Sequence, residues 1–190
     1  RRPPRSPPLY SSAASDVYKR QVSVNITAKP VDSKQWVVAK AQPEKPAAET
    51  NIARGQLVMG SSFWENGFEY FLAVDGNLSS DNYGKGAAWH SQRPALNQWI
   101  KIYLPETYLV TRIRLLNSSA QSAYRTKDFK IEISTDDITY REVKKGTMPD
   151  DGETWVEIKI PQTPAKYVRF TGLTGFNLEY AVGLKEIELY

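Results

Sequence analysis

The sequence contains no cysteine and only one histidine, His90. The lack of cysteine excludes disulfide scaffolds, thiolate metal sites and cysteine nucleophiles, and one histidine cannot form a histidine-rich metal cluster. No apolar run approaches the roughly 20 residues that a membrane-spanning helix needs. We therefore expect neither an integral membrane protein nor an enzyme of the many classes that depend on these groups.

Positive charge is also scarce where a nucleic-acid-binding domain would need it. The chain of 190 residues has a net charge of +4, and residues 1–20 alone carry five Lys and Arg against one Asp. Residues 51–190 carry 16 Lys and Arg against 17 Asp and Glu. A domain that binds phosphates keeps its excess cations in its folded part. We therefore expect no nucleic-acid partner.

The composition and length fit one folded domain with an appendage. Residues 1–21 are rich in Pro, Ser and Arg and show no strand or helix periodicity, so they cannot build a core. They resemble translated adaptor sequence and are predicted to be a non-native leader, the alternative being a natural disordered basic arm. Residues 22–50 hold two short strand-like segments, 22–26 and 36–39, and then a Pro- and Ala-rich linker. They are predicted to end an upstream module of a larger protein, and residues 51–190 to form the domain.

The domain is predicted to be all-β because apolar residues alternate with polar ones in one short segment after another. The segment STDDITY, residues 134–140, is predicted to join two strands as a hairpin. No stretch of ten or more residues keeps a helical period. We predict an antiparallel β-sandwich with loops gathered at its ends. The alternating segments are residues 98–104, 108–116, 128–134, 155–160, 166–170 and 185–190.

An ordered set of motifs in residues 51–190 resembles the discoidin or coagulation-factor type C family. The motifs are NIARGQLVMGSS (51–62), AVDG (73–76), AWHS (88–91), QWIKIYL (98–104), VTRIRLL (110–116), KDFKIEISTDDITYREV (127–143), KYVRFTGL (166–173) and GLKEIELY (183–190). The resemblance implies a galactose-binding-like jelly roll, of the branch to which many bacterial carbohydrate-binding modules belong. It also implies an extracellular or cell-surface location and a domain that is monomeric.

Several of these motifs also have a structural interpretation. Trp89 and Trp99 are predicted to point into the core, and His90, which follows Trp89, to point outward. Asp75-Gly76-Asn77 is predicted to form a turn in which the glycine has a positive φ. Ser61 and Ser62 are predicted to satisfy backbone groups of a turn.

The resemblance implies that a structural calcium ion binds near this turn. Its ligands would be Asp75, Asn77 and Glu186, together with carbonyl groups of the loop that ends at Ala88. Calcium prefers six to eight oxygen ligands. The family often has Thr or Ser at the position of Ala87, so one oxygen ligand is missing here. The alternative for Glu186 is a solvated or hydrogen-bonded carboxylate.

Three loops are predicted to bind the ligand, because binding residues concentrate on loops that a rigid scaffold positions. Aromatic faces stack on the apolar face of a pyranose, while Arg, Asn and Glu hydrogen-bond its hydroxyl groups. Trp64 and Arg125 are expected to be exposed, and Phe68, Phe71 and Tyr180 to anchor their own loops. The predicted ligand-binding residues are Phe63, Trp64, Glu65, Asn66, Tyr124, Arg125, Phe176 and Asn177.

We predict a non-catalytic carbohydrate-binding module with a glycan as its partner, the accessory domain of a larger glycan-active protein. The alternatives are a phospholipid-surface domain and a protein-adhesion domain. Residues 63–70 carry Glu65 and Glu69 but no Lys or Arg, which disfavours an anionic membrane. Candidate catalytic pairs such as Asp150 and Asp151 lie in a turn-like segment without a partner base, so an enzyme is the weakest alternative.

Overall fold

The computed structural model describes residues 45–46, 50–79 and 85–190, and all of them belong to the unit that spans Ala41–Tyr190. The short strand-like segments predicted within residues 22–39 lie outside the described residues. Strand β1, Lys45–Pro46, lies in the stretch predicted as a linker and pairs in parallel with β4. The predicted domain boundary at residue 50 stays a prediction.

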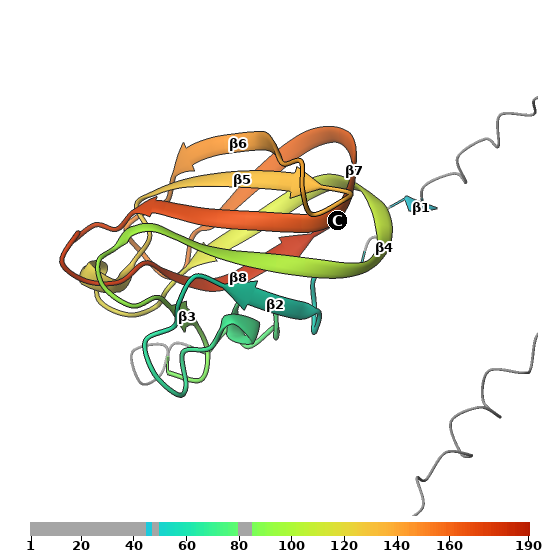
Figure 1. Cartoon of the computed structure of the whole chain (residues 1–190). Helices are drawn as coiled ribbons and strands as arrows, with labels where there is room; N and C mark the ends of the chain where they lie inside the picture. Colours follow the sequence, from blue (N-terminus) through green and yellow to red (C-terminus); the bar gives the residue numbers. More distant parts are fainter. Residues whose placement is uncertain (1–44, 47–49, 80–84) are drawn as a thin grey trace, which may run out of the picture. The chain divides into compact units, whose positions relative to one another are not determined.

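The domain is built almost entirely from antiparallel strands, as predicted (Figure 1). The strand order is β3-β8-β4-β7-β5-β6, and β1 and β2 also pair with β4. The longer strands have one buried face, because their apolar residues alternate with polar ones. The strands after β1 are β2 Leu57–Gly60, β3 Trp89–His90, β4 Leu96–Asn117, β5 Asp128–Ser134, β6 Arg141–Thr147, β7 Trp155–Thr174 and β8 Gly183–Leu189.

Strands β4 and β7 are long and pass through both layers of the sandwich (Figure 1). Residues 96–103 of β4 pair with the end of β7 and with β2, whereas residues 108–117 pair with the start of β7 and with β8. A register shift between Tyr103 and Tyr108 separates the two halves. Four segments that were predicted as separate strands therefore form two bent strands. Residues 98–104 and 108–116 both belong to β4, and residues 155–160 and 166–170 both belong to β7.

The core lies between the two layers. Its larger side chains come from both halves of β4 and from the strands facing them, and Trp89 packs edge-on against Phe170 with ring centroids 6.5 Å apart. Trp89 is fully buried, as predicted, and its Nε1 donates a hydrogen bond to the Ser62 carbonyl oxygen. The largest fully buried residues include Trp89, Ile100, Ile102, Ile113, Leu115, Phe129, Ile131, Phe170, Ile187 and Leu189.

The prediction that Trp99 points into the core is wrong. Trp99 is only partly buried, whereas its neighbour Ile100 is fully buried. Successive side chains of a strand point to opposite faces, so Ile100 and Ile102 occupy the inner face of β4 and Trp99 lies on the outer one.

The turns behave as predicted. Ser134 and Asp136 accept backbone hydrogen bonds within the hairpin between β5 and β6. The hydroxyl groups of Ser61 and Ser62 accept hydrogen bonds from the backbone amides of Trp99 and Gln92.

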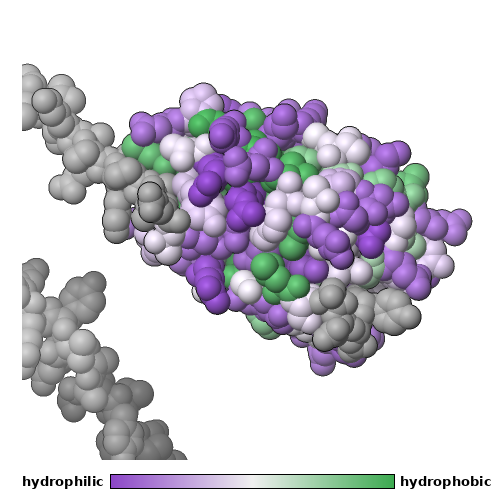
Figure 2. Space-filling view, turned by 180° about the vertical axis from the view of Figure 1, so that it is seen from behind, coloured by the Kyte–Doolittle hydropathy of each residue, from purple (hydrophilic) through white to green (hydrophobic). Residues whose placement is uncertain are grey.

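Helical structure in the described residues is limited to short 3₁₀ turns, which include η1, Tyr70–Ala73, and η3, Ser122–Tyr124. No helix in this part of the chain has the length and apolar character needed to cross a membrane. On the face opposite to that of Figure 1, hydrophilic side chains dominate and hydrophobic ones form small separate patches (Figure 2).

Candidate functional site

A pocket of about 340 Å³ lies among the loops of the domain. This volume is at the lower end of the range for small-molecule sites. Two of the three predicted ligand loops meet here, because the pocket is formed by the loop after β2, the short strand β3 and the loop after β4. Its lining residues are Trp64, Glu65, Phe68, His90, Gln121 and Tyr124.

His90 lies between two aromatic rings of the pocket lining. Its ring is stacked 4.6 Å from Phe68 and 5.8 Å from Tyr124, and its Nε2 lies 2.6 Å from Ser118 Oγ. The prediction that His90 points outward is wrong, since the residue is only 3% exposed. Strand β3 has two residues and is covered by loops, so both of its faces are buried. Burial lowers the pKa of His90 to about 3, and the imidazole is therefore neutral.

Backbone hydrogen bonds fix the loop that carries Trp64 and Glu65. The Trp64 amide donates a hydrogen bond to the His90 carbonyl oxygen, with 2.8 Å between nitrogen and oxygen. The His90 amide donates to the Phe68 carbonyl oxygen over 3.4 Å. Gly67 has φ +98°, a conformation that favours glycine. Trp64 is 39% exposed, in agreement with the prediction, and the Glu65 carboxylate lies 3.7 Å from Lys85 Nζ.

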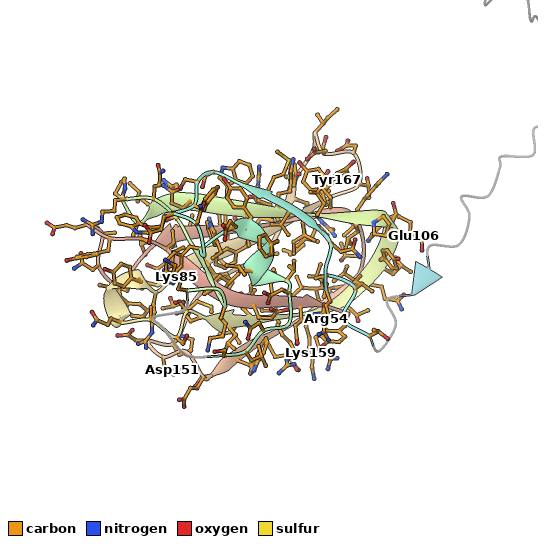
Figure 3. The ribbon with its side chains drawn as sticks, turned by 90° about the horizontal axis from the view of Figure 1, so that it is seen from below. Arg54, Lys85, Glu106, Asp151, Lys159 and Tyr167 are labelled. Atoms are coloured by element: carbon orange, nitrogen blue, oxygen red, sulfur yellow. The ribbon has the colours of Figure 1, made fainter. Side chains whose placement is uncertain are left out.

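Arg125 does not offer an exposed guanidinium, contrary to the prediction. Its Nε donates to the Ser118 carbonyl oxygen, and its Nη1 donates to both the carbonyl and a carboxylate oxygen of Asp150. The side chain of Arg125 is only 17% exposed. It joins the loop of Tyr124 to the loop before β7. Asp151, next to Asp150, lies at the same end of the domain as Lys85 (Figure 3).

Asn117 holds the base of the same loop from a fully buried position. Its amide group donates to the carbonyl oxygens of Thr126 and Pro149, and its side-chain oxygen accepts from the amides of Ser118 and Thr126. All the hydrogen-bonding capacity of this side chain is used in fixing the loop.

Arg93 lies at the rim of the pocket and was not predicted as a site residue. Its guanidinium carbon lies 4.9 Å from the centroid of the Trp64 ring and 4.6 Å from that of Tyr180. Tyr180 in turn packs edge-on against Tyr124, which brings the third predicted loop to the site. Arg93 does not adjoin any of the three predicted loops in the sequence, so no local pattern could have identified it.

The other predicted ligand residues do not line the pocket. Phe63 packs edge-on against Tyr70 and against the core, and Phe176 is partly buried. Asn66 and Asn177 are exposed, and Asn177 accepts a hydrogen bond from the Glu179 amide. Phe68 is buried, as expected of a loop anchor, whereas Phe71 is 54% exposed and was wrongly predicted to anchor its loop.

A second polar cluster joins the turn at Gly76 to strand β8. Gly76 has φ +77°, as predicted, and its amide donates to Glu186 Oε2 at 3.2 Å. Glu186 is buried and its Oε1 has no hydrogen-bond partner. Burial, and then the neighbouring charge of Asp75, raise the pKa of Glu186 to about 8. The side-chain amide of Asn77 donates to the Gly86 carbonyl oxygen, which ties the turn to the loop before β3.

This second cluster contains oxygen atoms, which are the ligands that calcium prefers. The Oε1 of Glu186 is buried without a hydrogen-bond partner, and burial also raises the pKa of Asp75. In the described ranges no three His, Cys, Asp or Glu side chains group together as metal ligands. A calcium ion would therefore depend on Asn77 and on backbone carbonyl groups as well as on the two carboxylates.

The pocket can bind a ligand that is partly apolar and partly hydrogen-bonding. Trp64, Phe68 and Tyr124 supply aromatic surface, while Glu65, Gln121 and the neutral His90 supply donors and acceptors. This combination suits a sugar ring, which has an apolar face and hydroxyl groups at its edge.

Comparison with protein families gives one match: the model described as F5/8 type C domain matches residues 58–183. None of the curated proteins compared with the chain matches it significantly.

Solved structures give many matches. A chitosan-binding module derived from a chitosanase/glucanase of Paenibacillus sp. IK-5 is 28% identical, with a TM-score of 0.60 over 74% of this chain and 98% of that chain. The lectin domain of lectinolysin, complexed with Lewis B antigen, is 26% identical, with a TM-score of 0.62 over 76% and 98%. A Clostridium perfringens domain in complex with GalNAc-β-1,3-galactose is 20% identical, with a TM-score of 0.63 over 74% and 99%, and supports the fold alone.

Proposed function

The chain belongs to the F5/8 type C domain family, and from that premise we propose that the domain is a non-catalytic carbohydrate-binding module. It binds a glycan in the pocket bounded by Trp64, His90 and Tyr124. The observation that carries this proposal is the combination of aromatic rings with a few polar groups in one small pocket. The module acts outside the cell or at its surface, as part of a larger glycan-active protein.

Two structural relatives support the ligand class. The chitosan-binding module and the lectin domain of lectinolysin, both above 25% identity, are each described by the carbohydrate they bind. A pocket of about 340 Å³ holds one or two sugar units, and the area buried is small. We therefore expect dissociation constants in the millimolar to micromolar range, about −4 to −8 kcal/mol.

The proposal is tested by a glycan array, followed by titration of the strongest ligand against variants. Trp64→Ala removes the exposed ring of the pocket and is expected to weaken binding at least about tenfold, since aromatic contacts dominate such sites. Phe71→Ala is the matched control, because Phe71 is an exposed aromatic residue that does not line the pocket. Equal binding by both variants and the parent would show that the site lies elsewhere.

We also propose that Asp75, Asn77 and Glu186 hold a structural calcium ion, with carbonyl groups of the loop that ends at Ala88. The buried and unpartnered Oε1 of Glu186 supports this proposal. When bound, the ion supplies the positive charge that this carboxylate lacks. The side chains of Asn77 and Glu186 join the turn at Gly76 to the loop before β3 and to strand β8. These connections hold β3, which pairs with β8, beside the pocket.

A lipid surface is the second candidate ligand. Leu96, the first residue of β4, and Leu178 are about half exposed, and a hydrogen bond from the Ala95 amide to the Leu178 carbonyl oxygen joins their segments close to Tyr180. Exposed apolar side chains beside a cation suit a membrane interface. Flotation with vesicles of phosphatidylcholine, with and without phosphatidylserine, separates this candidate from glycan binding.

A further inference from the structure

Arg93 is a cation at the rim of the pocket, and it has no counter-ion among the residues that the structure describes. It is exposed, and its guanidinium contacts the rings of Trp64 and Tyr180. Within the described residues Arg93 forms neither an ion pair nor a hydrogen bond through its side chain. Four other arginines of the domain have acidic partners: Arg112 with Glu157, Arg114 with Glu188, Arg125 with Asp150 and Arg169 with Glu132.

The two aromatic contacts hold the guanidinium without using its N–H groups. Cation–π contacts involve the face of each ring, so they leave the donors of Arg93 free for a ligand. The planar fork of donors on an arginine matches the paired oxygens of a carboxylate or a sulfate group. The rim of the pocket therefore presents a positioned donor for an anionic group.

The charge of the pocket itself is balanced. Among the described residues, Glu65 is the only acidic one in its lining, and its carboxylate lies 3.7 Å from Lys85 Nζ. Both side chains are about half exposed, so this pair contributes little to stability, but Lys85 offsets the charge that a ligand meets. Taken together, Glu65, Lys85 and Arg93 leave one positive charge at the site.

We propose that the preferred glycan carries an acidic group, the carboxylate of a uronic acid or a sulfate ester, and that Arg93 binds this group while the sugar ring occupies the pocket. This inference rests on the proposed function and specifies its ligand class. Gln121 and the neutral His90 then serve the hydroxyl groups, and Arg93 selects for charge.

The test compares acidic and neutral forms of the same sugar chain with the full-length protein at low salt. Trigalacturonate is titrated beside its methyl ester, and a sulfated galactan oligosaccharide beside its desulfated form. We expect the acidic form of one pair to bind about tenfold more tightly, because charge-assisted hydrogen bonds are about twice as strong as neutral ones. The pair that shows the difference identifies the acidic group.

Variants of Arg93 test whether this residue causes the preference for acidic glycans. Arg93→Gln is expected to abolish the difference between acidic and neutral forms, and Arg93→Lys to keep part of it, since lysine retains the charge but not the fork. The matched control is Arg112→Gln, because Arg112 also stacks on an aromatic ring, but that ring belongs to Tyr190, which does not line the pocket, whereas Arg93 stacks on the lining residue Trp64. The control is expected to bind as the parent does.

The outcomes separate this inference from the proposed function. Binding of neutral glycans that Trp64→Ala weakens, without preference for either acidic form, overturns the inference and leaves the function standing. If the protein instead prefers a cationic chitosan oligomer and Glu65→Gln abolishes that preference, the inference is also overturned and the function also stands. If no glycan binds, or if only vesicles containing phosphatidylserine do so, both proposals are overturned.

Discussion

At the scale of single residues, the imidazole of His90 owes its chemical state to burial. The ring is enclosed by Phe68 and Tyr124, and protonation would place a charge where solvent cannot stabilise it. His90 therefore remains neutral at any pH near neutrality, and its Nε2 is already paired with Ser118 Oγ.

This burial predicts a pH dependence of stability. The pKa of His90 is about 3 in the folded state, whereas its ordinary value, taken for the unfolded chain, is 6.5. Between these values the unfolded chain binds a proton that the folded chain does not, so stability is complete above pH 6.5 and falls as the pH is lowered. The loss from pH 7 to pH 5 is about 2 kcal/mol, at 1.36 kcal/mol for each pH unit below 6.5.

Urea unfolding of the parent and of His90→Gln at both pH values measures this effect. Subtracting the two variants removes the contribution of carboxyl groups, and His90 is the only histidine in the chain. We expect the stability advantage of the parent to shrink by about 2 kcal/mol at pH 5. A constant advantage would mean that solvent reaches the ring.

The two errors in side-chain orientation have different causes. Trp99 was predicted to lie on the inner face of its strand, and His90 was predicted to point outward because its neighbour Trp89 points inward. Alternation from Ile100 would have placed Trp99 correctly, because Ile100 and Ile102 are the buried residues of that segment. No alternation rule could have placed His90, since loops distant in sequence cover both faces of β3.

At the scale of elements, the pocket depends on loops that approach strand β8 very closely. A Cβ atom at Gly183 would lie 2.3 Å from the Tyr124 carbonyl oxygen and 2.6 Å from His90 Cδ2. Gly183 is the first residue of β8, and a side chain at this position would clash with Tyr124 and His90, which both line the pocket.

Gly183→Ala is therefore expected to displace Tyr124 and His90. We predict a loss of about 1–3 kcal/mol in unfolding free energy, the usual cost of overpacking, and a loss of glycan binding. Gly146→Ala is the control, because a Cβ atom there would meet only the Phe129 ring, at 3.0 Å and beyond, and the Lys144 side chain. The control is expected to be less stable than the parent but to bind glycan normally; unchanged binding by Gly183→Ala would contradict this account.

The strands themselves were largely predictable, because period-two alternation is a local property of the sequence. The continuity of β4 and β7 was not, because the bend between layers occurs at residues that interrupt the alternation and resemble a loop. Three pocket residues, Trp64, Glu65 and Tyr124, were predicted from their aromatic loops. The role of Arg125 was mistaken, because its partner Asp150 lies 25 residues away in the sequence.

At the scale of the whole domain, the turn at Gly76 and strand β8 are joined through Glu186, and calcium is expected to stabilise this connection. Binding to the folded state alone contributes about 2.7 kcal/mol at a hundredfold excess over the dissociation constant. The melting temperature should rise by several degrees with calcium and fall with chelator. Glu186→Gln should remove this response while leaving the fold intact, and Glu157→Gln, a change at an exposed carboxylate, should retain it.

The pH dependence of the metal-free protein gives a second readout. The pKa of Glu186 is about 8 in the folded state, above its ordinary value of 4.5. The stability that its protonation contributes is complete below pH 4.5 and is lost as the pH rises through 8. In chelator, the parent should therefore lose stability relative to Glu186→Gln between pH 6 and pH 8. A response to calcium that is absent at every pH would leave Asp75 and Asn77 as turn residues only.

The central claim is that the loop pocket is the glycan site, and mapping of chemical shifts with the strongest ligand from the array tests it most directly. We predict that the Trp64 indole resonance and the backbone amides of residues 64–68, 90–93 and 118–125 shift with increasing ligand. The amides around Tyr103 and Tyr167, which pair across the outer face of the sheet, should not change. Shifts that cluster around Tyr103 and Tyr167, with the Trp64 indole unmoved, would contradict the account.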